Sequence, residues 1–133
     1  MLDKLISLAT YPGKAGPAAG DVEVELEAIA PQVQPRLRLW NQAGRDPREP
    51  PRVPGANRWR LGTPESLAGW TLTWSVRMAP DPARRSRFEL RVQLFQDGDL
   101  LPDGTFFYAG PLEALEERSG RFHFTAGPPK TSG

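Results

Sequence analysis

Arginine and tryptophan side chains gather in the middle of the chain. Residues 34–60 hold seven arginines against two carboxylates, a local net charge of +5. The arginines are Arg36, Arg38, Arg45, Arg48, Arg52, Arg58 and Arg60, and Trp40 and Trp59 lie among them. Guanidinium groups bind carboxylates and phosphates, and indole rings stack on planar partners. This segment is therefore the first candidate for binding chemistry.

Carboxylates gather on both sides of that basic segment. Residues 21–27 carry four, and residues 96–117 carry six with no basic residue between them. The second group is Asp97, Asp99, Asp103, Glu113, Glu116 and Glu117. A chain with a basic middle and acidic flanks is complementary to a second copy of itself or to a charged partner protein. The alternative is that the same charges pair within one molecule across a sheet.

These patterns predict a non-catalytic protein-binding or assembly module with segregated basic and acidic surfaces. The predicted contact residues are the arginines, the two tryptophans and the six carboxylates named above. A carbohydrate- or nucleic-acid-binding sandwich is the alternative, because Trp40 and Trp59 could stack on sugars or bases. Nucleic acid is the less favoured partner, since the formal net charge of the whole chain is only +1.

Residues that could perform catalysis or hold a metal are few. His123 is the single histidine, it lies between two phenylalanines, and the chain has no cysteine and no Gly-x-Ser-x-Gly motif. The aspartates at 97, 99 and 103 lack the spacing of a calcium loop and fit turns instead. The sequence predicts no enzymatic activity, no cofactor and no metal site.

Length and composition bound the architecture. A chain of 133 residues is expected to form one domain, and 15 prolines with 13 glycines favour short elements joined by many turns. No apolar run is long enough for a membrane helix and no convincing signal peptide is visible, so we expect a cytoplasmic protein or part of a soluble assembly. Fourteen arginines against three lysines, with few asparagines, fit either a heat-adapted source or a GC-rich genome.

The element on which the core should be built is the strand at residues 70–78, because its side chains alternate strictly. One face is apolar and the other is polar, the side-chain period of a β-strand. The predicted inward residues are Trp70, Leu72, Trp74, Val76 and Met78. The same alternation at 88–94 suggests a hairpin partner, in which Met78 faces Phe88 and Arg77 meets Glu89 on the outer face.

Other segments follow the same reasoning. Alternation predicts strands at 22–28, 36–40, 58–61, 105–109 and 122–124, while residues 1–10 fit either a strand or a helical turn. Thr63 and Pro64 can cap one helical turn, and residues 111–118 are the one longer helix-like patch. The expected fold is an all-β, antiparallel two-layer sandwich of about seven short strands, with one helical turn near 111–118. A Pro/Arg-rich arm or long loop at 41–57 and a flexible tail at 127–133 complete the single domain.

Overall fold

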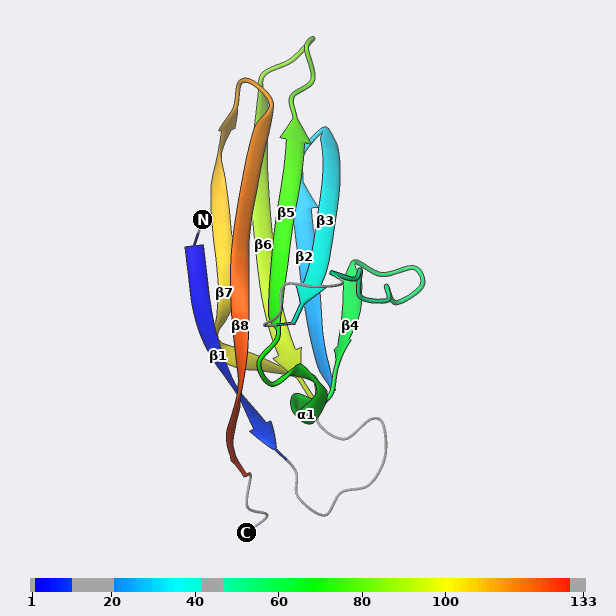
Figure 1. Cartoon of the computed structure of the whole chain (residues 1–133). Helices are drawn as coiled ribbons and strands as arrows, with labels where there is room; N and C mark the ends of the chain where they lie inside the picture. The colour runs from blue at the N-terminus through cyan, green and yellow to red at the C-terminus, as the bar shows by residue number, and fades with distance from the viewer. Residues whose placement is uncertain (1, 11–20, 42–46, 130–133) are drawn as a thin grey trace.

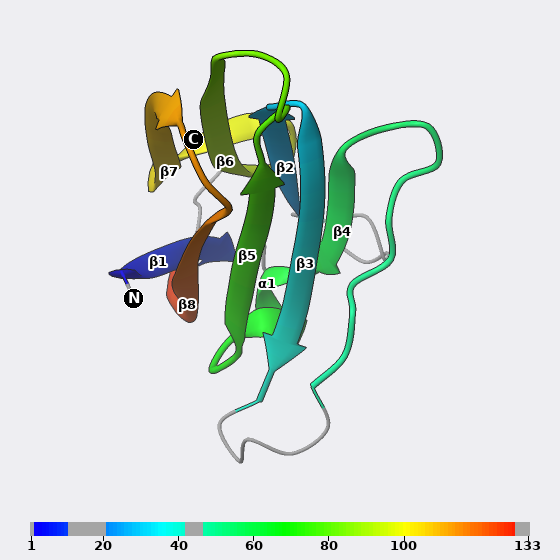
Figure 2. The same ribbon diagram turned by 90° about the horizontal axis from the view of Figure 1, so that it is seen from above.

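A computed structural model describes residues 2–10, 21–41 and 47–129, and its fold is the predicted all-β sandwich. Two four-stranded sheets pack face to face, as the two rows of strands in Figure 2 show. Sheet A has the order β1 (Leu2–Thr10), β8 (Glu116–Pro129), β5 (Thr71–Ala79), β3 (Gln32–Trp40). Sheet B has the order β4 (Arg58–Gly62), β2 (Val22–Ile29), β6 (Ser86–Gln96), β7 (Asp99–Leu112).

The core lies between the sheets, and the apolar stripe of β5 is its centre. Leu72, Trp74, Val76 and Met78 are each 0% exposed, whereas Trp70 precedes the strand and is half-buried. The ring of Trp74 lies 5.2 Å from the ring of Phe106 on the opposite sheet, in an edge-to-face arrangement. Burying each large apolar side chain contributes about 1.5–3 kcal/mol, so this stripe is a main source of stability.

The predicted hairpin between the strands at 70–78 and 88–94 is wrong. Strand β5 pairs with β3 and β8, and β6 pairs with β2 and β7, so the two strands belong to different sheets. Arg77 stands opposite Glu117 and not opposite Glu89. Both apolar stripes still face the core, because they meet across the interior from opposite layers (Figure 1). Alternation identifies the buried face of each strand but does not say which sheet holds it.

The predicted helical patch at 111–118 is also wrong. Strand β7 ends at Leu112 and β8 begins at Glu116, so this segment is the connection between two strands. Leu112 is 2% exposed and Leu115 is 61% exposed, which places them in different environments and not on one helix face. The helix propensity of Leu, Ala and Glu is a weak preference that sheet pairing overrides here.

One helical turn does form where Thr63 and Pro64 predicted it. The short helix α1 (Pro64–Leu67) has Thr63 as its N-cap, and Thr63 and Ser66 complete a reciprocal capping box. The N-terminal segment, for which the sequence left a strand and a helical turn open, forms strand β1. This strand runs parallel to β8 at the edge of sheet A. The described residues form eight strands in place of about seven, and β7 and β8 have 14 residues each.

The described part of the Pro/Arg arm is joined to β3 and β4 by backbone hydrogen bonds. Leu39 of β3 and Arg48 exchange backbone hydrogen bonds of 2.7 and 3.0 Å, and Arg60 of β4 donates to the Pro51 carbonyl at 2.9 Å. The segment thus bridges the edges of both sheets. Residues 42–46 lie outside the described residues. Residues 127–129 of the predicted tail belong to β8, and residues 130–133 lie outside the described residues.

Gly120 of β8 packs closely against Trp74 in the core. A Cβ built on Gly120 would lie 2.9 Å from two atoms of the indole and 3.0 Å from Phe106, so any side chain there must displace these rings. We expect Gly120→Ala to lower the free energy of unfolding by about 1–3 kcal/mol, the usual cost of overpacking. Chemical denaturation measures this value.

Gly110→Ala is the matched control for that substitution. Gly110 lies in β7, where an added Cβ would meet only Phe88 at an ordinary 3.7 Å. We expect Gly110→Ala to change stability much less than Gly120→Ala. Equal effects of the two substitutions would contradict the packing argument.

Candidate functional site

The outward face of sheet A brings together polar side chains from three neighbouring strands. The ladder register aligns them in rows across β3, β5 and β8. The rows are Trp40–Thr71–His123, Arg38–Thr73–Arg121 and Arg36–Ser75–Ser119. We call these nine residues the sheet A face. Because the side chains of β5 in these rows are small hydroxyl groups, the centre of the sheet A face is lower than its two sides, where larger side chains lie.

A hollow of about 370 Å³ opens on the sheet A face. Its lining consists of Trp40, Thr71, Thr73, Arg121 and His123. The indole Nε1 of Trp40 is buried and has no hydrogen-bond partner among the described residues. The hollow therefore combines an aromatic wall with hydroxyl, imidazole and guanidinium groups, which suits a polar ligand or a side chain of a partner protein.

A hydrogen-bonded network connects this hollow to the first strand. Nδ1 of His123 lies 2.9 Å from Oγ1 of Thr71, and Nε2 lies 3.4 Å from Oδ1 of Asp3. Nε of Arg121 donates to the same Asp3 oxygen at 2.8 Å. Partial desolvation raises the pKa of Asp3, but the hydrogen bond and charge of Arg121, followed by those of His123, outweigh it and hold that pKa below its ordinary value.

The order of these groups, carboxylate to imidazole to hydroxyl, is the order found in hydrolytic triads. Catalysis by such a triad also needs converging donors for the oxyanion. Thr71 lies in β5, which is paired on both sides. The backbone N–H groups of β5 are therefore used in the hydrogen bonds to β3 and β8 and are not free to act as such donors. We interpret the network as one that positions the sheet A face and attaches β1 to β8.

The structure separates the predicted arginines into two groups. Arg36 and Arg38 lie on the sheet A face, and neither forms an ion pair with any residue that the structure describes. Arg58 and Arg60 lie on the outward face of sheet B beside the acidic strand β2. Of these four strand arginines, only Arg36 and Arg38 retain unpaired charge for a partner.

On the outward face of sheet B, charges that lie in separate segments of the sequence form ion pairs with one another. Arg58 contacts Glu25 at 2.8 Å and Glu23 at 3.4 Å, while Arg60 contacts Glu23 at 3.7 Å. The hydrogen bond to Glu25 raises the pKa of the Arg58 guanidinium, against an opposing effect of desolvation. The intramolecular alternative thus describes this face, and the prediction of segregated surfaces is wrong there.

The remaining basic and aromatic residues are held by local contacts. Trp59 is 3% exposed, so its expected role as an exposed binding residue does not fit its burial. The guanidinium of Arg52 covers the Trp59 ring at 5.1 Å, and Arg48 lies 4.8 Å from the ring of Trp70. Arg45 lies outside the described residues.

The predicted acidic region is divided between opposite ends of the sandwich. Asp97, Asp99 and Asp103 lie around the β6–β7 turn, and Glu113, Glu116 and Glu117 lie around the β7–β8 turn (Figure 1). The extended strand from residue 105 to 112 alone separates them by about 23 Å. Glu116 pairs with Arg118 at 3.2 Å and Glu117 with Arg77 at 3.3 Å. These carboxylates therefore do not form one contact surface.

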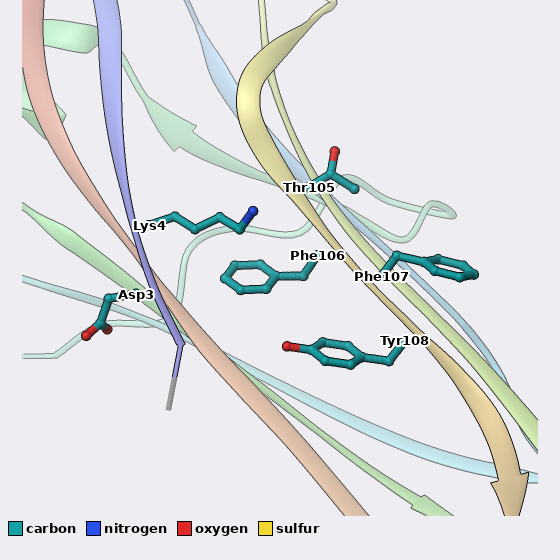
Figure 3. A pocket seen from close by; sticks show the side chains of 6 residues that line it. All are labelled: Asp3, Lys4, Thr105, Phe106, Phe107 and Tyr108. Carbon is teal, nitrogen blue, oxygen red and sulfur yellow. The ribbon is translucent and has the colours of Figure 1, made fainter.

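A second hollow, of about 540 Å³, lies where β1 and β7 approach each other (Figure 3). Lys4, Phe106 and Tyr108 point into it, while Asp3 and Phe107 point away. The ammonium group of Lys4 lies 4.9 Å from the centre of the Phe106 ring. Sequence reasoning missed this hollow, because nothing in the sequence indicated that residues about 100 positions apart become neighbours.

Asp3, Thr71, Thr73 and Arg121 were not predicted from the sequence as contact residues. The polar half of the alternating strand at 71–77 was the available signal for the two threonines. No sequence signal indicated Asp3 and Arg121, because their contact depends on the parallel pairing of β1 with β8, which places Asp3 opposite Arg121.

Comparison with protein-family models, with curated proteins and with solved structures gives no match for this chain. Within the described ranges, no three His, Cys, Asp or Glu side chains are grouped so that they could bind a metal ion. The same part of the chain contains no helix that is long and apolar enough to span a membrane.

The contacts of Asp3 predict a pH dependence of stability. A carboxyl group whose pKa is lowered by folding stabilises the folded state above its unfolded pKa of about 3.9, and this contribution is lost as pH falls through the lower folded value. We expect Asp3→Asn to be less stable than the wild type at pH 5, with the difference shrinking below about pH 4. Urea denaturation over this pH range measures it. A difference between Asp3→Asn and the wild type that stays constant from pH 5 to pH 3 would contradict this role of Asp3.

Proposed function

We propose that the protein is a non-catalytic protein-binding or assembly module and that its contact surface is the sheet A face. The observation that carries the proposal is the pair of arginines, Arg36 and Arg38, that lack an ion-pair partner in the described structure while those of β4 are paired. Both lie beside Trp40 on an edge strand.

The chemistry of this surface suits an acidic partner. Arg36 and Arg38 are two residues apart on one strand, so their side chains leave the same face about 7 Å apart. A guanidinium group can bind a carboxylate through two parallel hydrogen bonds. Arginine and tryptophan are also the residues that most often dominate the binding energy of protein interfaces. An acidic strand or loop laid along β3 would satisfy both arginines.

The chain itself offers one such acidic partner. Asp99 and Asp103 lie near the β6–β7 turn, and neither makes an ion pair in the described part of the chain. Contact between the sheet A face of one copy and this turn of another would be a head-to-tail arrangement, which builds rings or filaments. A different acidic protein would use the same face of the module.

Charge reversal of the two arginines tests the proposal. We expect Arg36→Glu with Arg38→Glu to weaken association at least about tenfold, since each central arginine contributes on the order of 1 kcal/mol or more. Analytical ultracentrifugation measures self-association, and co-purification from the native source measures capture of another protein. Arg84→Glu with Arg85→Glu, two exposed loop arginines, gives the same change of charge elsewhere and should have little effect. Equal losses in both double variants would contradict a specific role for the sheet A face.

Mixing complementary variants distinguishes self-assembly from binding of another protein. A copy with Asp99→Arg and Asp103→Arg keeps its basic face, and a copy with Arg36→Glu and Arg38→Glu keeps its acidic turn. If contact is head-to-tail, neither variant alone makes the contact between the sheet A face and the β6–β7 turn, and mixing the two variants restores assembly through it. If each variant alone assembles like the wild type, the head-to-tail contact is wrong.

A carbohydrate- or nucleic-acid-binding sandwich is the second candidate, favoured by Trp40 at the rim of the hollow. Burial of Trp59 leaves Trp40 as the aromatic residue of the original pair that could stack. For this candidate we expect tight binding on a glycan array or in a single-strand shift assay, reduced at least about tenfold by Trp40→Ala because a stacked ring contributes about 1–3 kcal/mol. Trp59→Ala is no control, since it would disturb the core.

A further inference from the structure

Each sheet of the sandwich has two edges, and three of the four carry protection. Edges with free N–H and C=O groups pair readily with other strands, and proteins protect them with charges or by covering them. The edge of β3 is covered by the hydrogen bonds between Leu39 and Arg48. The edge of β4 is covered by the hydrogen bond of 2.8 Å from Val53 to the Arg58 carbonyl and that from Arg60 to Pro51.

Strand β1 is protected in a different way. It carries the charged residues Asp3 and Lys4 near its start. Near its end, the buried side chain of Gln96 accepts a hydrogen bond from the Ala9 N–H at 3.1 Å and donates one to the Ala9 carbonyl at 2.7 Å. The amide of Gln96 thus occupies the positions that a neighbouring strand would use.

Strand β7 has neither charges nor a covering segment between residues 104 and 110, a stretch flanked by Pro102 and Pro111. Residues 104–112 contain no charged side chain, and in the described structure β7 pairs with β6 alone. Phe107 is 53% exposed in the middle of this run, on the outward side of the strand. The hollow in Figure 3 lies along the same edge, between β7 and β1. An uncharged, β-prone edge beside an open hollow is a typical site of strand addition.

We propose that two copies of this chain pair antiparallel through the free edges of β7, with Phe107 opposite Phe107 of the second copy. The residues around this position are symmetric in size, small–ring–ring–ring–small, in the order Thr105, Phe106, Phe107, Tyr108, Ala109. In this register Thr105 faces Ala109 of the second copy, and Phe106 faces Tyr108. Small residues thus meet small ones and rings meet rings.

The side-chain directions agree with this register. Phe106 is 3% exposed and Tyr108 is half-buried, and both point to the inner side of sheet B, whereas Phe107 points outward. Opposed residues of an antiparallel pair share one face, so inner rings meet inner rings and the outer ring meets its own copy. Residues 104–112 carry no charge of their own, and the cations that lie over these rings, Lys4, Arg91 and Arg118, come from other strands. The product is one continuous sheet across both copies.

This contact is independent of the acidic partner proposed for the sheet A face. It uses the edge of sheet B and not the face of sheet A, and rising salt should not weaken it because no ion pair joins the two copies. The wild type should dimerise with rising concentration between about 1 µM and about 1 mM, at low and at high salt alike.

Opposite charges at one position provide the sharpest test. We expect Phe107→Lys and Phe107→Glu each to raise the dimer dissociation constant at least about tenfold, because like charges meet on the twofold axis. An equimolar mixture of the two variants should dimerise again. Leu5→Lys is the matched control, because Leu5 is 78% exposed on another strand and lies outside the contact. Ala109→Lys should also weaken the dimer, and it replaces Phe107→Lys if the latter unfolds in a thermal melt.

Hydrogen exchange gives a second readout. The amides within residues 105–109 whose N–H groups point away from β6 should become protected as the wild-type concentration rises, and those of Phe107→Lys should not. A wild type that stays monomeric throughout this range, a mixture of the charge variants that stays monomeric, or protection that does not depend on concentration would each overturn the proposal. Capture of a β-strand from a different protein on this edge, with no homodimer, would overturn it as well.

Discussion

The burial of Trp74 against Gly120 is the contact on which the rest of the structure depends. Its indole is 0% exposed, and β8 approaches it closely only because Gly120 has no side chain. The same ring contacts Phe106 and Tyr108 of β7. One side chain thus joins β5 and β8 of one sheet to an edge strand of the other. The position of β8 in turn sets that of β1, whose Asp3 reaches Arg121 and His123 on the outer face.

The two outer faces of the sandwich differ in how their charges are used. On sheet B the glutamates of β2 lie between the arginines of β4 and β6, and Arg91 approaches Glu27 at 3.9 Å. Exposed pairs of this kind contribute about 0–1 kcal/mol each and leave little net charge for a partner. On sheet A the basic residues of β3 face small hydroxyl side chains of β5 in place of carboxylates. This difference directs the functional proposal to sheet A.

Much of the fold was predictable because alternation reports burial directly. The stripes of β2, β5 and β6, the brief strand β4, the capped turn at α1 and the two-residue turn at Asp97 and Gly98 all occur as expected. The pairing of these strands was not predictable. Strands β5 and β6 are neighbours in the chain with matching apolar stripes, yet a hairpin and two facing layers bury those stripes equally well.

The candidate site shows the same division between local and tertiary information. Arg36, Arg38 and Trp40 stood out from composition alone, and they do lie on one exposed face. Whether an arginine is free depends on the strand beside it, so Arg58 resembles Arg38 in sequence but is neutralised by Glu25 from 33 residues away. Trp59 and Trp40 were likewise equivalent in sequence, although only the first is buried under the Pro/Arg arm.

The sequence by itself determined that most of the chain forms strands and which side of these strands is apolar, because both follow from residue types a few positions apart. Only the tertiary structure decided which strands are neighbours, which charges cancel and which edge stays open. Those outcomes depend on contacts between distant segments, such as Asp3 with Arg121 across 118 residues. A local pattern does not indicate such partners, since the same alternating strand can be placed in either sheet at nearly equal free energy.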